Sequence, residues 1–163
     1  MFGATVARAV VAGAIAASVS TAVAHDEAEA LKVVRDGERD RAYVLDRDGV
    51  DVIKLSTGHK LARVTLAGWV WVDEAYSAPP DVALGPQGEV IVTSNVLPVL
   101  WRIDRQTLGT TVHVLVLDQD RDKDVGFTRL RWSPGLRTFA AWTDSGARWH
   151  IDPALAKAWK ISR

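Results

Sequence analysis

The sequence predicts an all-β protein in which three four-stranded antiparallel units follow one another along the chain. Related segments recur about every 48 positions. Short runs with alternating apolar side chains, typical of strands, are separated by Gly, Pro and Asn turn signals. Helical periodicity is poor over the same segments, so strands explain the pattern better than helices do.

Residues 1–24 are expected to form an export signal that is not part of the fold. Arg8 precedes a run of small and apolar residues, and no acidic residue occurs before Asp26. The run ends in Ala-Val-Ala at 22–24, the small-x-small pattern that signal peptidase recognises. The run is shorter than the roughly 20 apolar residues of a membrane-spanning helix. A cleaved signal is therefore the favoured interpretation, and an uncleaved anchor is the alternative. The pattern predicts a mature chain from His25 and a periplasmic or secreted location.

The composition excludes several classes of function. The 163 residues include 20 basic and 20 acidic side chains and no cysteine. This balance argues against nucleic acid as a partner, and against membrane contact beyond the signal peptide. Without cysteine there is no disulfide framework, thiolate metal site or cysteine nucleophile.

The repeat is clearest between the second and third units. In the first unit Ile53 matches Ile103 at an offset of 50, which places a small insertion or deletion between the units. We expect the units to span about residues 30–72, 79–118 and 126–163. The matches at an offset of 48 are Trp101 with Trp149, Ile103 with Ile151, and Tyr43 with Ile91 and then Phe139.

Each unit is expected to contain four short strands. Apolar residues lie on both faces of the fourth strand, so each sheet is expected to be covered on both sides. In the second unit the predicted strands are Asp81–Leu84, Val90–Ser94, Val99–Asp104 and Val112–Leu117.

Two segments carry a resemblance to a known superfamily. The Gly-Pro-Gln-Gly turn at 85–88 leads into Val-Ile-Val-Thr-Ser-Asn at 90–95, and Leu-Trp-Arg-Ile-Asp follows at 100–104. Together they resemble the YVTN and WD-repeat-like β-propellers, and the resemblance covers residues 30–163. It implies propeller blades, each packed between two neighbours, and it identifies architecture better than activity.

The number of units departs from that family. Propellers close with about four to eight blades, whereas this sequence supplies three, so an incomplete propeller with two open ends is expected. We expect a second copy of the chain, completing a ring as a homodimer, or a periplasmic protein to cover these ends. An open fan of three sheets and a β-sandwich are the structural alternatives.

An acidic run between the second and third units is the candidate metal site. Asp118, Asp120, Asp122 and Asp124 alternate with other residues, and their oxygens suit Ca²⁺, the one cofactor that the sequence raises. The run is not an EF-hand, because Lys123 stands where the sharp turn needs glycine. The alternative interpretation is a solvated loop.

Three aromatic residues are the candidate ligand-binding site. Trp69, Trp71 and Tyr76 lie in the connection between the first and second units. Such connections cross one end of a blade stack, where their rings could stack on a ligand. The alternative is that the rings fill gaps between blades.

No catalytic signature stands out, so the predicted function is an exported, non-enzymatic binding or interaction module with an unknown ligand. Ser94 lacks a nucleophile-elbow context, and no phosphate loop or dinucleotide fingerprint occurs. The first alternative is a calcium-dependent propeller enzyme, such as a lactonase-like hydrolase or a quinoprotein-like dehydrogenase. It would use Asp81, Asn95 and Asp124 near the central channel. The second alternative is a degenerate fragment with a structural role.

Overall fold

The computed structural model describes residues 30–118 and 125–162, so the predicted signal peptide lies outside the described residues. The described residues form three sheets and one short 3-10 helix, η1 (Gly37–Arg39). None of the helical structure described is long or apolar enough to cross a membrane. The first sheet contains β1 (Lys32–Asp36), β2 (Arg41–Leu45), β3 (Gly49–Lys54) and β4 (Lys60–Thr65). The second contains β5 (Val82–Leu84), β6 (Val90–Thr93), β7 (Val99–Ile103) and β8 (Thr110–Val114). The third contains β10 (Arg129–Ser133), β11 (Thr138–Trp142), β12 (Arg148–Ile151), β13 (Lys157–Ser162) and β9 (Val116–Leu117).

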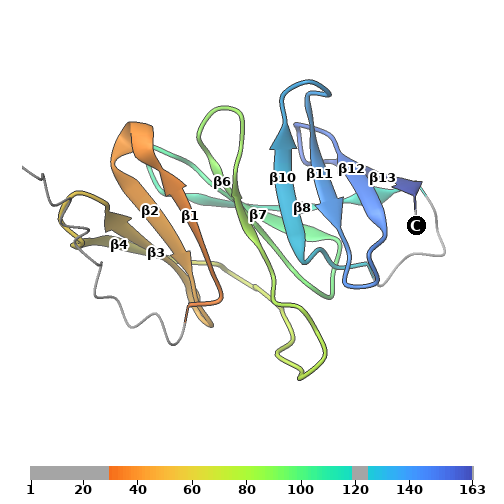
Figure 1. Cartoon of the computed structure of the whole chain (residues 1–163), viewed down its shortest axis with the longest axis horizontal. Helices are drawn as coiled ribbons and strands as arrows, with labels where there is room; N and C mark the ends of the chain where they lie inside the picture. The colour runs from red at the N-terminus through yellow and green to blue at the C-terminus, as the bar shows by residue number, and fades with distance from the viewer. Residues whose placement is uncertain (1–29, 119–124, 163) are drawn as a thin grey trace, which may run out of the picture.

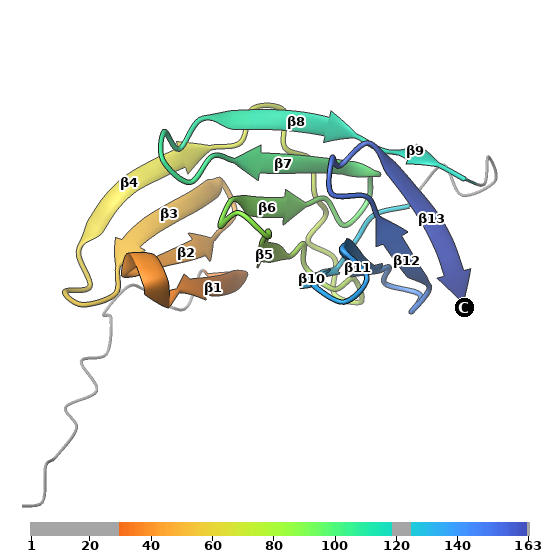
Figure 2. The same cartoon turned by 90° about the horizontal axis from the view of Figure 1, so that it is seen from above.

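The sheets stand side by side as an open fan (Figures 1 and 2). Within each sheet, four consecutive strands pair antiparallel in chain order. The first strands, β1, β5 and β10, adjoin one another on the inner side, and β4, β8 and β13 form the outer rim. The predicted fold class is therefore confirmed, since the protein is all-β and its units resemble the blades of an incomplete propeller.

Two hydrophobic clusters fill the two spaces between the sheets. Tyr43 and Trp101 belong to the cluster between the first and second sheets, and Phe139 and Trp149 belong to the cluster between the second and third. Trp101 and Trp149, matched in the sequence, both point toward the preceding sheet. Large aromatic side chains bury roughly 150–250 Å² each, so these positions contribute strongly to sheet packing.

The strict offset of 48 is wrong for one of the matched residues. Tyr43 and Ile91 face the following sheet, whereas Phe139 faces the preceding sheet. In the third sheet the turn between the first two strands is one residue longer than in the second, and the next turn is one residue shorter. A shift of one residue moves a side chain to the opposite face of a strand, so Ala140 occupies the place of Ile91.

The predicted fourth strand of the second unit is divided between two sheets. The backbone N–H of Leu115 still bonds to the Pro98 carbonyl of the second sheet, at 2.9 Å. The next residue, Val116, instead donates to Ala156 at 2.9 Å, and β9 pairs parallel with β13. The continuous segment from β8 to β9 therefore joins the outer edges of the second and third sheets.

A candidate interaction loop at one end of the fan

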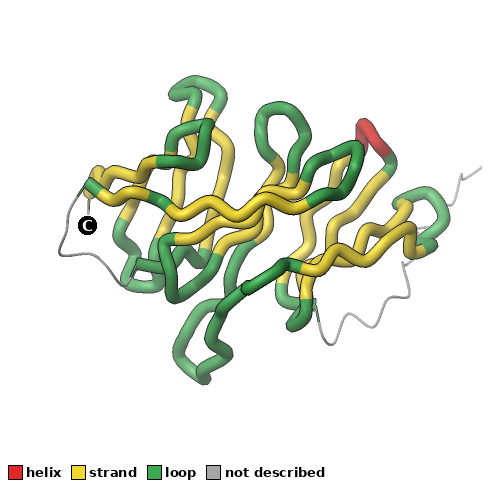
Figure 3. The backbone as a smooth tube through the Cα atoms, turned by 180° about the vertical axis from the view of Figure 1, so that it is seen from behind, coloured by secondary structure: helices red, strands yellow, loops and turns green. Residues whose placement is uncertain are grey.

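The connection between β4 and β5, residues 66–81, leaves the fan on the side opposite to the β1–β2 turn (Figures 1 and 3). We name it the interaction loop. It contains Pro79 and Pro80 shortly before β5, and proline lacks the backbone N–H that donates to a neighbouring strand. Gly68 adopts a φ of +67°, a conformation that glycine accommodates without strain.

The two predicted tryptophans form the base of the interaction loop. Trp69 and Trp71 stack with ring centroids 5.7 Å apart and planes at 26°. The Nε1 of Trp69 donates to the Thr93 carbonyl at 3.1 Å, and the Nε1 of Trp71 donates to the Arg47 carbonyl at 3.3 Å. Trp69 also packs against the core between the first two sheets. These rings therefore attach the loop to the turns beneath it.

Ser94 and Asn95, which follow β6, hold both legs of the interaction loop. The Ser94 hydroxyl donates to the Val70 carbonyl at 2.6 Å. The Asn95 side chain accepts from the Val72 N–H at 2.9 Å and donates to the carbonyls of Val72, at 2.7 Å, and Ala78, at 3.1 Å. This clamp was not expected from the sequence, although a Ser-Asn pair directly after a buried strand is a signal for side-chain bonds to nearby backbone.

The tip between these legs projects outward. Tyr76 is 98% exposed. Asp73 forms an ion pair with Arg47 of the first sheet at 2.6 Å, and the Ala78 N–H donates to Asp144 of the third sheet at 3.1 Å. Contacts with all three sheets thus hold the loop while its tyrosine remains free for contact.

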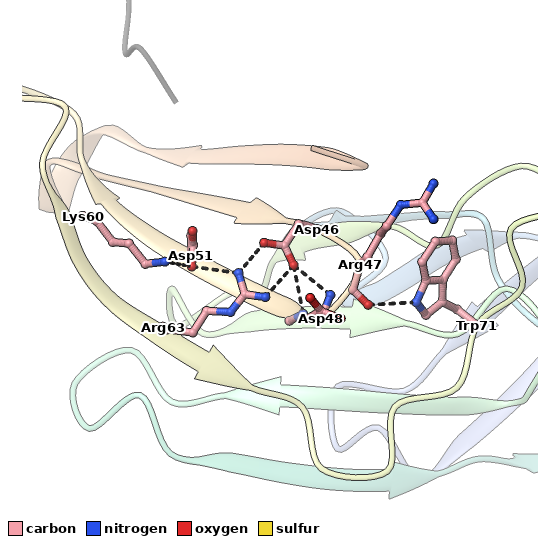
Figure 4. A network of polar contacts seen from close by, with 8 residues as sticks. Asp46, Arg47, Asp48, Asp51, Lys60, Arg63 and Trp71 are labelled. Carbon is pink, nitrogen blue, oxygen red and sulfur yellow. Dashed lines mark hydrogen bonds and ion pairs between the residues drawn. The ribbon is translucent and has the colours of Figure 1, made fainter. Parts of the chain in front are cut away.

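A polar network on the first sheet fixes the turn beneath Trp71 (Figure 4). Arg63 donates to both Asp46 and Asp51, and Lys60 Nζ lies 2.7 Å from Asp51. Burial by itself raises the pKa of both carboxyl groups, but the hydrogen bonds from Arg63 and the nearby positive charges leave each pKa below its usual value. Both carboxyl groups are therefore charged at neutral pH.

Asp81 lies at the start of β5, on the inner side of the fan. Its carboxylate accepts the Leu130 N–H of β10 at 2.8 Å and so joins the second sheet to the third. Burial raises the pKa of Asp81, although the hydrogen bonds from the Leu130 and Val82 N–H groups and the charges of Lys32 and Arg129 oppose this. Of the three residues considered for a central catalytic site, Asp81 and Asn95 bind backbone groups, and Asp124 lies outside the described residues.

The acidic run is described only at Asp118. Its carboxylate accepts the Lys160 N–H at 3.3 Å, beside β13. Asp120, Asp122 and Asp124 lie outside the described residues, so calcium binding by this run stays a prediction. Over residues 30–118 and 125–162, no group of three or more His, Asp or Glu side chains could hold a metal ion.

Three solved structures share the fold at low sequence identity. Hydrazine synthase of Kuenenia stuttgartiensis has a TM-score of 0.60 and 14% identity, over 92% of this chain and 38% of that chain. The dihydro-heme d1 dehydrogenase NirN has a TM-score of 0.55 and 16% identity, over 80% of this chain and 27% of its own. PorZ, a surface component of the type-IX secretion system of Porphyromonas gingivalis, has a TM-score of 0.55 and 13% identity, over 82% and 16%.

No family model matches the chain, and no curated protein matches it in sequence. The three solved structures are β-propeller-type proteins, some of them enzymes and some not, so the likeness extends to the fold alone. The chain spans less than two fifths of the length of each of them. It is therefore similar to part of a β-propeller, and the finer resemblance to the YVTN and WD-repeat-like families stays a prediction.

Proposed function

We propose that this chain is an exported, non-enzymatic binding module that presents the interaction loop to a partner protein. One observation carries the proposal, namely the exposed Tyr76 at the tip of a loop whose two legs are clamped by Asn95. Tyrosine is enriched among the residues that dominate protein interfaces. A loop already held in one conformation loses little entropy on binding.

The polar side chains near the loop support binding over catalysis. Among the polar residues near the loop, Ser94, Asn95 and Asp81 are buried or half-buried and could supply a nucleophile, an oxygen ligand or a base. Each is engaged with backbone groups that hold the loop or join two sheets. Their chemistry is thus used to build the surface on which Tyr76 stands.

The partner is proposed to share the compartment that the export signal implies. The signal is the pattern at residues 1–24. Export would bring the module together with periplasmic or secreted proteins. Val70, which is also exposed, lies in the same loop as Tyr76 and would add apolar contact at the edge of the interface.

The experiment places a photo-crosslinking amino acid at position 76 of the full chain, expressed in a bacterium that exports it. The matched control carries the same group at Gln106, an exposed residue in the turn between β7 and β8 at the opposite end of the fan. We expect a crosslinked protein from position 76 and not from position 106. With that protein purified, Tyr76→Ala should weaken binding roughly tenfold or more.

Two results would overturn the proposal. One is the absence of any crosslinked protein at position 76, or the same products from both positions. The other is an identified partner whose affinity for the Tyr76→Ala variant equals its affinity for the wild type.

A further inference from the structure

The face of the third sheet that points away from the second sheet has an unusual composition. Leu130, Phe139, Trp149 and Ala158 point into the core, so the residues between them point outward. Strand pairing places these outward residues in two adjoining rows. We name this surface the arginine face, and its rows are Arg129, Trp142 and Arg148, then Arg131, Ala140, His150 and Trp159.

In the first two sheets, the equivalent face points toward the following sheet and carries buried apolar residues. Val50 and Leu100 are fully buried against the following sheet, and the residue 48 positions after Leu100 is the exposed Arg148. Ala83 is buried in the same way, and 48 positions later stands the exposed Arg131. The arginine face therefore departs from the apolar pattern at positions that the repeat uses to receive a neighbouring blade.

The charge of the arginine face has one sign. The acidic residue that follows His150 in the outward row of β12 is Asp152, which lies beyond the end of the strand. Its carboxylate accepts the backbone N–H groups of Ala156 and Lys157. The Arg129 guanidinium lies 5.6 Å from the Trp142 ring centroid, which holds it over the ring. His150 and Trp159 meet edge to face at 5.7 Å.

We propose that the arginine face docks an acidic segment of a partner protein. The planar forks of Arg131 and Arg148 suit carboxylates, which they bind with two parallel hydrogen bonds. Trp142 and Trp159 would supply apolar contact beside these ion pairs. None of its residues forms the hydrogen bonds and ion pair of Trp69, Trp71, Asp73, Ser94, Asn95 and Asp144 that hold the interaction loop.

Two observations favour an acidic protein over other occupants. The Arg129 guanidinium lies over the Trp142 ring, so on that side of the ring a charge stands where a sugar would stack. A second copy closing a ring would bring the open face of the first sheet against the arginine face. On that face Lys60 and Arg63 are ion-paired with Asp46 and Asp51, which leaves the charge of Arg35 as a positive excess that would face Arg131 and Arg148.

The test measures binding of the full chain to labelled poly-L-glutamate by fluorescence anisotropy at low salt. We expect Arg131→Glu with Arg148→Glu to weaken binding roughly tenfold or more. The matched control, Arg35→Glu on the open face of the first sheet, should leave the affinity unchanged. Arg131→Lys with Arg148→Lys should lose part of the affinity, since lysine keeps the charge without the fork. Unfolding curves establish that each variant is folded.

Four outcomes would overturn the proposal. The first is that the wild-type chain does not bind poly-L-glutamate, and the second is that Arg35→Glu weakens binding as much as the double charge reversal does. The third is that a sulfated polysaccharide or single-stranded DNA binds the same face more tightly than poly-L-glutamate does. The fourth is that the double lysine variant binds poly-L-glutamate as well as the wild type does.

Discussion

At the scale of single residues, equivalent positions of the repeat differ in their hydrogen bonds. Trp101 and Trp149 are both buried and both point toward the preceding sheet. The Nε1 of Trp101 donates to the Ala67 carbonyl at 2.9 Å. The Nε1 of Trp149 is buried without a hydrogen-bond partner among the described residues. The two tryptophans therefore share a packing role, but only the indole N–H of Trp101 has a hydrogen-bond partner among the described residues.

This difference predicts unequal effects of the same substitution. Trp101→Phe removes the part-buried hydrogen bond to the Ala67 carbonyl, which costs about 1 kcal/mol beyond the loss of packing. Trp149→Phe removes a donor that has no acceptor, so that additional cost is absent. Urea unfolding of both variants should show Trp101→Phe to be the less stable by about 1 kcal/mol or more. Equal losses of stability would contradict this account.

The raised pKa of Asp81 predicts a dependence of stability on pH. Because the folded protein holds the Asp81 proton to a higher pH than the unfolded chain does, the free energy of unfolding falls as pH rises between the two pKa values. That window begins near pH 4, the ordinary pKa of an aspartate. Asp81→Asn keeps an acceptor for the Leu130 N–H and removes the titration. Urea unfolding from about pH 4 to 7 should give a flatter profile for this variant.

The control for that measurement is Asp104→Asn. Asp104 is exposed, and the hydrogen bond that it accepts from the Thr107 N–H lowers its pKa, so its substitution should leave the window above pH 4 unchanged. A wild-type profile that is already flat, or unchanged by Asp81→Asn, would contradict the pH prediction.

At the scale of the elements, the β8–β9 segment couples two sheets through backbone bonds. Val116 and Asp118 donate to β13 and the residue before it, whereas the antiparallel pairing of β8 directs the Val114 N–H away from β7. The side chains of both valines are largely exposed. The contribution of this segment therefore comes from its backbone more than from its side chains.

Proline substitution separates these two backbone positions. Val116→Pro removes the bond to Ala156 and should detach β9 from β13, at a cost of about 2–3 kcal/mol. Val114→Pro removes an N–H at a sheet edge, where proline is tolerated, and should cost about 1 kcal/mol or less. Thermal unfolding together with hydrogen exchange at β13 measures the difference. Similar effects of the two prolines would contradict the proposed coupling.

At the scale of the whole molecule, both open faces of the fan carry charge at positions where the inner faces are apolar, although the open face of the first sheet also contains the buried apolar cluster of Ala42, Val44 and Ile53. Asp51 on the first sheet occupies the position of Trp101 in the second, and Arg148 on the third occupies the position of Leu100. Terminal units of repeat proteins need a polar outer face. Both open faces therefore differ from the inner faces at these two positions.

This arrangement predicts a monomer. The expectation from the sequence that a second copy completes a ring is still untested, but the positive charges of Arg35 and Arg148 would oppose such closure. Light scattering of the purified chain should give the monomer mass at both low and high salt. A dimer that strengthens as salt screens these charges would favour ring closure instead.

Much of the fold could be predicted because strand alternation and turn residues are local signals. Trp101 and Trp149 were correctly matched for this reason. The match of Phe139 with Tyr43 and Ile91 fails because two turns of unequal length compensate within one unit, which a fixed offset cannot detect. The Asn95 clamp was missed because its partners, Val72 and Ala78, are more than fifteen residues away in the sequence.

The sequence by itself determined the all-β class, the three units and the aromatic content of the interaction loop, because hydrophobic alternation and turn chemistry act over a few residues. Only the tertiary structure decided which tryptophans hold the loop and that Tyr76 is the aromatic side chain exposed at its tip. It also decided that Arg131 and Arg148 share one open face. These properties depend on which sheets pack together. Side chains that packing brings together can be far apart in the sequence, so no local pattern predicts their contact.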